Sequence, residues 1–228
     1  FQLGFLPIAY KKLGASDEKR FFSKTLTYYT FILVFIALGL SLFSKELIQL
    51  LAQKPEYYAA YSVVPIISLA FVIKGIQYTY ALSFHYAKKT IYVAAIIIIT
   101  ALINVGLNFL FIKEFGFMGA AFSMLISTFF MMILSYFFGR RIYPIQYENK
   151  KLIILIVAGI ILFFIGDLTN EINIFIRLIF KMILIISLPF VLHLFNFYEE
   201  AELRRVKNAW TKWKNPSRWK ENIKKIKL

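Results

Sequence analysis

The sequence lacks cysteine and contains only two histidines, His85 and His193, among its 228 residues. Without cysteine the chain has no disulfide, no thiolate nucleophile and no cysteine-bound metal. The two isolated histidines have no acidic neighbour at a metal-ligand spacing, and the chain lacks a glycine-rich phosphate loop and a G-x-S-x-G motif. The apolar segments also lack paired carboxylates. We therefore expect no catalytic site, no metal and no cofactor, and we do not expect an enzyme.

Acidic residues are scarce as well, with 12 Asp and Glu against 27 Lys and Arg, which gives a formal net charge of +15. Hydrophobic residues make up 60% of the chain and the mean hydropathy is +0.67, well above the values of soluble domains. They are gathered in runs of about 20 residues, the length that a helix needs to cross roughly 30 Å of hydrocarbon. The composition predicts an all-α, polytopic membrane helix bundle.

Six transmembrane helices can be drawn through these apolar runs. They are expected at residues 25–43, 61–84, 91–112, 116–138, 152–165 and 174–198. The opening segment, residues 1–10, is interpreted as the end of a truncated transmembrane helix, because it is apolar and no basic segment precedes it as in a signal peptide. The predicted organisation is four helices within residues 11–138, two accessory helices within 139–198, and a basic amphipathic cytoplasmic tail at 199–228.

Lysine and arginine are distributed unevenly between the two alternating sets of connections. One set, which includes the tail, holds 21 of them, and the other holds only 3, namely Lys45, Lys54 and Lys113. Basic connections stay on the cytoplasmic side of a membrane, so residues 11–24 and the C-terminus are expected in the cytoplasm. Because the basic residues lie beside membrane spans, their expected partner is anionic phospholipid and not nucleic acid.

The tail shows a second pattern. Apolar side chains recur at helical spacing among its basic residues: Leu203, Val206, Trp210 and Trp213. This pattern favours an interfacial helix with its aromatic face in the lipid headgroups, and a solvated basic tail is the alternative. The candidate membrane-surface residues are Arg204, Arg205, Trp210 and Trp213.

Lys74 lies near the middle of the second predicted span, where a charge costs roughly 3 kcal/mol or more. Its side chain is too far from either end of the span to reach water by snorkelling. Lys74 should therefore face a watery cavity, a charged ligand or an acid elsewhere in the protein. Gln77 and Tyr78 fall on the same helical face, as does His85 farther along.

The third span carries Thr100, Asn104 and Asn108 at successive four-residue intervals. Such a stripe either ties two helices together or lines the path of a solute, and both interpretations stay open. The candidate substrate-binding residues are Lys74, Gln77, Tyr78, Asn104 and Asn108. Near the outer end of the last span, Arg177 and Lys181 are interpreted as cations that snorkel or meet an anionic headgroup.

A short outer turn is predicted at residues 113–116, where Lys113 and Glu114 interrupt an apolar stretch and Gly116 permits a reversal. Small residues then recur at three- and four-residue spacing, which predicts a flank that can approach a neighbouring backbone closely. They are Gly116, Ala120, Ser123 and Ser127.

The segment around this turn, INVGLNFLFIKEFGFMGAAFS (residues 103–123), resembles a motif of polysaccharide flippases. These are the O-antigen and polysaccharide transporters of the multidrug/oligosaccharidyl-lipid/polysaccharide exporter superfamily. The similarity lies in Asn104-x-x-x-Asn108, the following turn with Gly116, and Gly119-Ala120-Ala121, while Lys113 stands where the family often has proline. The segments FLPIAY and PEYYAAYSVVPIISLAFVIKGIQYTYALSFHYAKKT also resemble the family, so the likeness extends along nearly the whole chain.

The resemblance implies that the chain is the C-terminal portion of a two-lobe transporter: most of the second lobe, two accessory helices and the tail. Such proteins move lipid-linked oligosaccharides, commonly carried on undecaprenyl pyrophosphate, across the bacterial inner membrane by alternating access. Basic residues of the central cavity receive the pyrophosphate, a role that Lys74 would take here. A polysaccharide polymerase and glycosyltransferases are further implied partners.

Three alternatives stay open at this point. One is a multidrug or cation antiporter of the same superfamily, which would need buried acids for ion coupling. Another is a membrane-embedded polysaccharide polymerase or ligase, whose working residues usually lie on a large outer loop. The longest outer loop expected here is residues 44–60. The last is a membrane subunit with a purely structural role.

Overall fold

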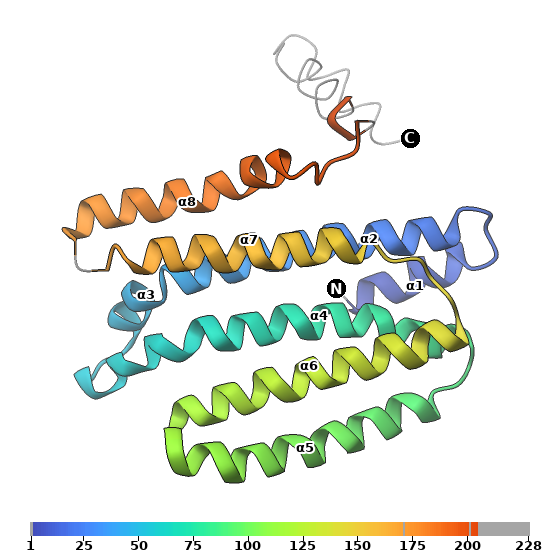
Figure 1. Ribbon diagram of the computed structural model, residues 1–228, viewed down its shortest axis with the longest axis horizontal. Helices are drawn as coiled ribbons and strands as arrows, with labels where there is room; N and C mark the ends of the chain where they lie inside the picture. The colour runs from blue at the N-terminus through green and yellow to red at the C-terminus, as the bar shows by residue number, and fades with distance from the viewer. Residues whose placement is uncertain (1, 171, 201, 205–228) are drawn as a thin grey trace. The chain divides into compact units, whose positions relative to one another are not determined.

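The computed structural model describes residues 2–170, 172–200 and 202–204, and all regular secondary structure in this part is helical (Figure 1). The elements in order are α1 (Gln2–Lys12), α2 (Glu18–Leu42), α3 (Ser44–Leu51), the 3-10 helix η1 (Pro55–Val63), α4 (Val64–Tyr86), α5 (Ile91–Phe115), α6 (Phe117–Ile142), α7 (Asn149–Asp167) and α8 (Ile174–Leu194). The described residues up to Leu188 form one compact unit, and those from Pro189 onward belong to a second. The predicted all-α helix bundle is confirmed.

Within the described residues, six helices are long and apolar enough to cross a membrane, as predicted. They are α2, the continuous segment Pro55–Tyr86, α5, α6, α7 and α8. The chain is therefore a multi-pass membrane protein. The bounds differ from the prediction mainly at the ends, since α2 begins at Glu18 and continues through a basic, water-facing first turn. The segment predicted as the long outer loop folds into α3 and η1.

Two of the membrane helices end in a left-handed residue that is not glycine. At the end of α4, Lys88 has φ 57° and the Lys89 amide donates to the Phe84 carbonyl at 2.8 Å. At the end of α8, Asn196 has φ 52° and the Phe197 amide donates to the Leu192 carbonyl at 3.1 Å. This pairing is the Schellman arrangement, which satisfies carbonyls that the helix end leaves open. In α8 this arrangement ends the helix at Leu194, four residues before the predicted end of the last span.

A single residue, Gly116, joins α5 to α6. Its φ of 57° and ψ of −135° lie in a region that glycine adopts readily. Three residues later, a Cβ at Gly119 would collide with the carbonyl of Phe111, and Ser123 and Ser127 continue this buried flank of α6. The predicted close approach is confirmed, but the residue that makes it is Gly119 and not the predicted Ala120, which is half-buried.

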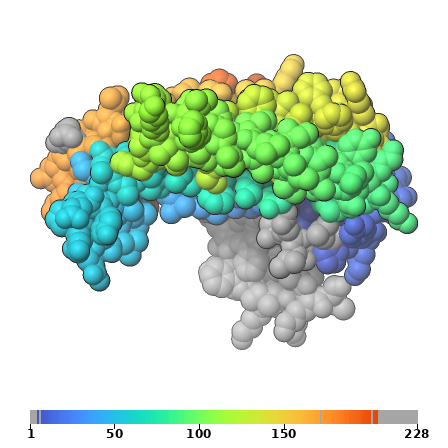
Figure 2. Space-filling model, turned by 90° about the horizontal axis from the view of Figure 1, so that it is seen from below, coloured from blue at the N-terminus to red at the C-terminus, as the bar shows by residue number. Residues whose placement is uncertain are grey.

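In the unit of residues 1–188, α4 lies between α2 and α6, α5 packs on the far side of α6, and α7 packs on α2 (Figure 1). The outer side of α5 faces away from these neighbours and is seen in green in Figure 2. It exposes a row of large apolar side chains: Ile98, Leu102, Val105, Phe109 and Leu110. A surface of this kind is unfavourable in water, so α5 must be covered by lipid or by other membrane helices.

Candidate functional site

A hollow of about 150 Å³ lies where α4 meets α1, α5 and α6. It is lined by Phe5, Lys74, Gln77, Tyr78, Thr79, Ala81, Leu82, His85, Val93, Ile97 and Met131. Four of these residues, Lys74, Gln77, Tyr78 and His85, belong to the face of α4 on which the sequence predicted polar groups. The structure thus places three of the five candidate substrate-binding residues around one hollow.

Lys74 supplies a positive charge at the middle of the span. It lies ten residues after the start of α4 and twelve before its end, or about 15 and 18 Å along the helix axis. Its Nζ lies 5.9 Å from the centre of the Phe71 ring, a cation–π contact that offsets part of the cost of leaving water. Among the residues that the structure describes, no carboxylate lies within 4.0 Å of this nitrogen. Lys74 therefore keeps its capacity to attract an anion.

Gln77 and Thr79, which also line the hollow, each carry a buried polar atom without a hydrogen bond in the described structure. Gln77 is 2% exposed and its Nε2 donates to Ser135 Oγ at 3.1 Å, but its Oε1 has no partner in the described structure. The Oγ1 of Thr79, which is 3% exposed, has none either. A buried polar atom without a hydrogen bond costs about 1–3 kcal/mol, so a ligand or water that reaches these atoms would be stabilised.

Thr79 and Ser135 were not among the sequence candidates. Thr79 also lines the hollow, although it lies about 140° around α4 from Lys74 and therefore outside the predicted polar face. Ser135 belongs to another span, and only its spacing was informative: together with Ser123 and Ser127 it forms a series of small hydroxyls at multiples of four along α6. That series is the signal from which it could have been found.

Asn104 and Asn108 lie apart from this hollow and bond to α6 and to each other. Asn104 Nδ2 donates to Ser127 Oγ at 2.9 Å, and Asn108 Nδ2 donates to Asn104 Oδ1 at 2.9 Å. Thr100, one turn earlier, donates to the Ile96 carbonyl of its own helix at 2.8 Å. Of the two interpretations left open by the sequence, this geometry supports the tie between helices.

Arg177 and Lys181 belong to a second polar cluster, where the structure corrects the sequence interpretation. The buried Lys181 donates from Nζ to both carboxylate oxygens of Glu46, at 2.9 and 3.1 Å, and to Asn170 Oδ1 at 3.0 Å. Arg177 donates from Nη1 to the Asn170 carbonyl at 2.8 Å. Its Nε lies 2.8 Å from Glu46 Oε1, which makes an ion pair, but the angle does not allow a hydrogen bond. The expectation of snorkelling or headgroup contacts is wrong, because both cations pair with a carboxylate of α3.

Glu46 remains ionised in this cluster. Burial raises the pKa of its carboxyl, but the hydrogen bond from Lys181 and the charges of Lys181 and Arg177 lower it by more. The net pKa lies below the ordinary value of 4.5. The cluster therefore joins α3 to α8 by a charged contact between residues 135 positions apart in the chain.

A third cluster lies at the opposite ends of the spans, around Glu148. Its carboxylate accepts hydrogen bonds from Lys24 at 2.9 Å and from Thr27 Oγ1 at 2.8 Å, and lies 3.1 Å from Lys151. Burial raises the pKa of Glu148, but these donors lower it by more, so the net pKa is lowered. The cluster fixes the start of α7 against α2.

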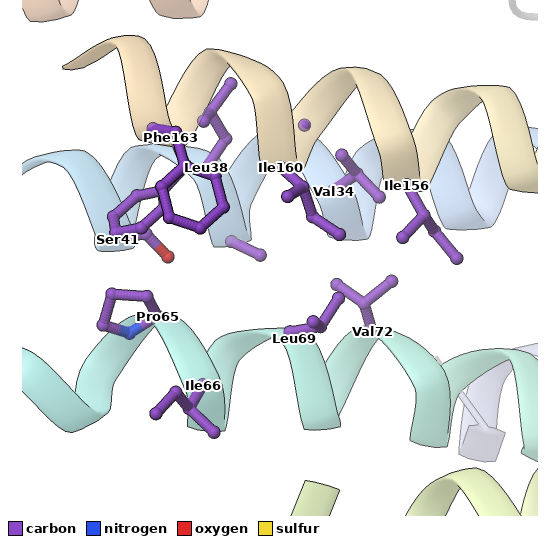
Figure 3. A pocket seen from close by; sticks show the side chains of 13 residues that line it. Val34, Leu38, Ser41, Pro65, Ile66, Leu69, Val72, Ile156, Ile160 and Phe163 are labelled. Carbon is purple, nitrogen blue, oxygen red and sulfur yellow. The ribbon is translucent and has the colours of Figure 1, made fainter. Parts of the chain in front are cut away.

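A larger apolar hollow of about 200 Å³ lies between α2, α4 and α7. Figure 3 shows Val34 and Leu38 of α2 and Ile160 of α7 facing Leu69 and Val72 of α4. Its lining contains no charged side chain. It can hold hydrocarbon, but Ser41 is its one polar side chain and it has no charge to attract an anion, so the hollow beside Lys74 is the better candidate for a binding site.

The candidate membrane-surface residues are described only in part. Arg204 is exposed and pairs with Glu200 at 3.3 Å. Arg205, Trp210 and Trp213 lie outside the described residues. The expectation of an interfacial helix in the tail therefore stays a prediction.

A comparison with models of known protein families finds no match, and a search of curated proteins finds none either.

Proposed function

We propose that the chain is part of a flippase that moves a lipid-linked oligosaccharide across the bacterial inner membrane by alternating access. In this proposal the C-terminus lies in the cytoplasm. The observation that carries it is the hollow of α4, where the ammonium group of Lys74 lies at mid-span without a described carboxylate partner. A cation in this position costs free energy unless it serves a ligand or a wet cavity.

The chemistry of the hollow suits a phosphorylated sugar. The phosphate of an undecaprenyl-pyrophosphate carrier would be attracted by Lys74, as an ammonium group attracts phosphate without needing a fixed geometry. Gln77 Oε1 can only accept a hydrogen bond, and Thr79 Oγ1 can donate or accept one. Sugar hydroxyls offer both functions, and Tyr78, which is more than one-third exposed, provides a further hydroxyl.

Transport then requires an exchange of environments and no covalent step. A charged headgroup cannot enter hydrocarbon alone, because the transfer of an ion from water costs many kcal/mol. A polar, cationic cavity replaces the water that the headgroup loses, while the polyprenyl chain stays in lipid. Alternating access moves this cavity from one side of the membrane to the other by a shift between two conformations.

The antiporter alternative needs a carboxylate that can gain and lose a proton or bind a cation. Glu46 is held by Lys181 and Arg177, and its lowered pKa keeps it ionised. Glu148 is held in the same way by Lys24 and Lys151. These paired carboxylates favour a structural role, so the flippase is the stronger proposal for the described part of the chain.

Substitution of Lys74 tests this function in the intact protein. We expect Lys74→Ala to reduce surface polysaccharide about tenfold to a hundredfold, the effect of losing one charge-assisted hydrogen bond to the substrate. Lys74→Arg should retain much of the activity, because it keeps the charge. Lys113→Ala, which removes a lysine at the exposed outer turn, is the matched control. Full export by Lys74→Ala at normal protein level would exclude Lys74 from the mechanism.

A further inference from the structure

A separate groove of about 250 Å³ lies over α4 between α6 and α7. Its walls include Ile76 and Tyr80 of α4, Met132 and Tyr136 of α6, and Asn149 and Ile153 of α7. The space exists because α6 packs on α4 and α5, whereas α7 packs on α2 (Figure 1). Ile76 and Tyr80 lie about 200° and 240° around α4 from Lys74, so the groove is on the other side of that helix.

The groove has one polar end. Tyr80 donates from its hydroxyl to Asn149 Oδ1 at 3.2 Å, and Asn149 Nδ2 donates to the Tyr136 hydroxyl at 3.0 Å. Arg140, which is exposed, donates to the same Tyr136 hydroxyl at 3.3 Å. Side chains of α4, α6 and α7 therefore meet at this end and place a guanidinium group beside it.

The rest of the groove is apolar and runs away from this end along all three helices. Ile76 lies four residues from Tyr80, Met132 four residues from Tyr136, and Ile153 four residues from Asn149. From Asn149 to Ile156 the axis of α7 advances about 10 Å. Ile153 is 62% exposed, so the groove is open on its outer side. This arrangement of a polar end and an apolar channel matches a lipid headgroup and the first part of an acyl chain.

The charge at the polar end selects an anionic lipid. Arg140 contacts this end through Tyr136, and Arg141 and Lys150 are exposed residues that directly follow Arg140 and Asn149 in the chain. None of the three has a carboxylate within 4.0 Å in the described part of the chain, and Glu148 is already bound by Lys24 and Lys151. Each basic residue near a membrane surface strengthens its attraction to an anionic headgroup. The tyrosines also suit the headgroup level, where aromatic side chains with a polar tip concentrate.

We propose that the groove between α4, α6 and α7 binds one anionic phospholipid, with an acyl chain along Ile153 and Ile156 and its phosphate at Arg140 and Lys150. The apolar hollow of Figure 3 has the hydroxyl of Ser41 but no cation, so nothing there selects an anionic headgroup. The lipid would fill the space that the helices leave open and hold α7 against α4 and α6. It is distinct from the transported substrate, which the Lys74 hollow would receive.

The test is lipid retention by the full-length protein in nanodiscs with equal amounts of phosphatidylglycerol and phosphatidylcholine, read by native mass spectrometry. Arg140→Ala with Lys150→Ala should lower the ratio of bound phosphatidylglycerol to phosphatidylcholine about five- to thirtyfold, the effect of one to two phosphate contacts. The matched control, Lys88→Ala with Lys89→Ala, removes the same charge from another exposed connection and should leave the ratio unchanged. Ile153→Trp should fill the groove and lower the retention of both lipids.

Several outcomes would overturn the proposal. Equal losses in the two double variants would show a general effect of charge, and unchanged retention in Ile153→Trp would place the lipid elsewhere. Complete displacement of phosphatidylglycerol by polyprenyl phosphate at the same mole fraction would assign the groove to the transported lipid. Lys74→Ala should retain phosphatidylglycerol normally, so failure of this proposal and failure of the flippase proposal can be told apart.

Discussion

At the scale of single residues, Thr79 and Thr27 show two ways of burying the same hydroxyl. Thr27 is 2% exposed and its Oγ1 donates to Glu148, whereas Thr79 is 3% exposed and its Oγ1 has no partner in the described structure. A buried hydroxyl with a charged partner stabilises the fold, and a buried hydroxyl without one lowers its stability. Thr79 is thus a position where stability is lost, and in the proposed flippase a hydroxyl of the substrate would supply the missing hydrogen bond.

Replacement of each threonine by valine separates these roles. Thr79→Val should leave the free energy of unfolding unchanged or raise it by about 1 kcal/mol, while Thr27→Val should lower it by about 1–2 kcal/mol. Thermal unfolding of the purified protein measures the difference, and surface polysaccharide reports transport. We expect Thr79→Val to reduce transport. A clear loss of stability in Thr79→Val would mean that its hydroxyl has a structural partner.

The sequence predicted the shared face of Lys74, Gln77 and Tyr78 because all three lie on one helix, where spacing alone fixes direction. It did not predict the partner of Lys181. Glu46 lies 135 positions away, on a short helix between two spans, and no periodicity links the two residues. The expectation that the outer cations face lipid headgroups failed for this reason: charge pairing across elements depends on the fold.

At the scale of elements, the α5–α6 hairpin depends on a close backbone approach at Gly119. We expect Gly119→Ala to destabilise the protein by about 1–3 kcal/mol, because its Cβ would collide with a carbonyl that belongs to the backbone of α5. Gly106→Ala is the matched control, since a Cβ there meets nothing within 4 Å and should stabilise α5 by about 0.5–1 kcal/mol. Thermal unfolding in detergent distinguishes the two. Equal effects would contradict the close approach.

The contact between α3 and α8 should respond to acid. The pKa of Glu46 is lower in the folded protein than in the unfolded chain, so its contribution to stability is complete above about pH 4.5 and is lost as the pH falls through the folded value. We expect the melting temperature to drop between pH 5 and pH 3, and Glu46→Gln to reduce that drop. Glu148→Gln should leave unchanged the part of the drop in melting temperature that is due to Glu46. Identical acid sensitivity in the wild type and Glu46→Gln would exclude this role.

At the scale of the whole molecule, the number of spans was predictable and their packing was not. Each run of about 20 apolar residues carries its own evidence for a membrane helix, because the thickness of hydrocarbon sets the length. Helix neighbours instead depend on shape, as where Gly119 meets Phe111 or where Asn104 meets Ser127. The hollow beside Lys74 depends on four helices at once, so the sequence indicated only the α4 side of it.

The absence of cysteine makes the predicted orientation directly testable. Glu114→Cys, beside Gly116, should react with a membrane-impermeant maleimide in intact cells. Lys88→Cys, on the opposite set of connections, should react only after the membrane is opened. Both residues are exposed, so labelling should not depend on unfolding. The reverse pattern would show that the basic connections face outward and that the positive-inside assignment is wrong.

The single residue between α5 and α6 also bears on how these two helices are inserted into the membrane. Gly116 is the whole connection, and Gly119 lies against the backbone of Phe111. The ends of the two helices beside this turn therefore cannot move apart. We therefore expect α5 and α6 to enter the bilayer together, as one hairpin. Insertion of these two helices into the membrane would then depend on a connection that is one glycine long.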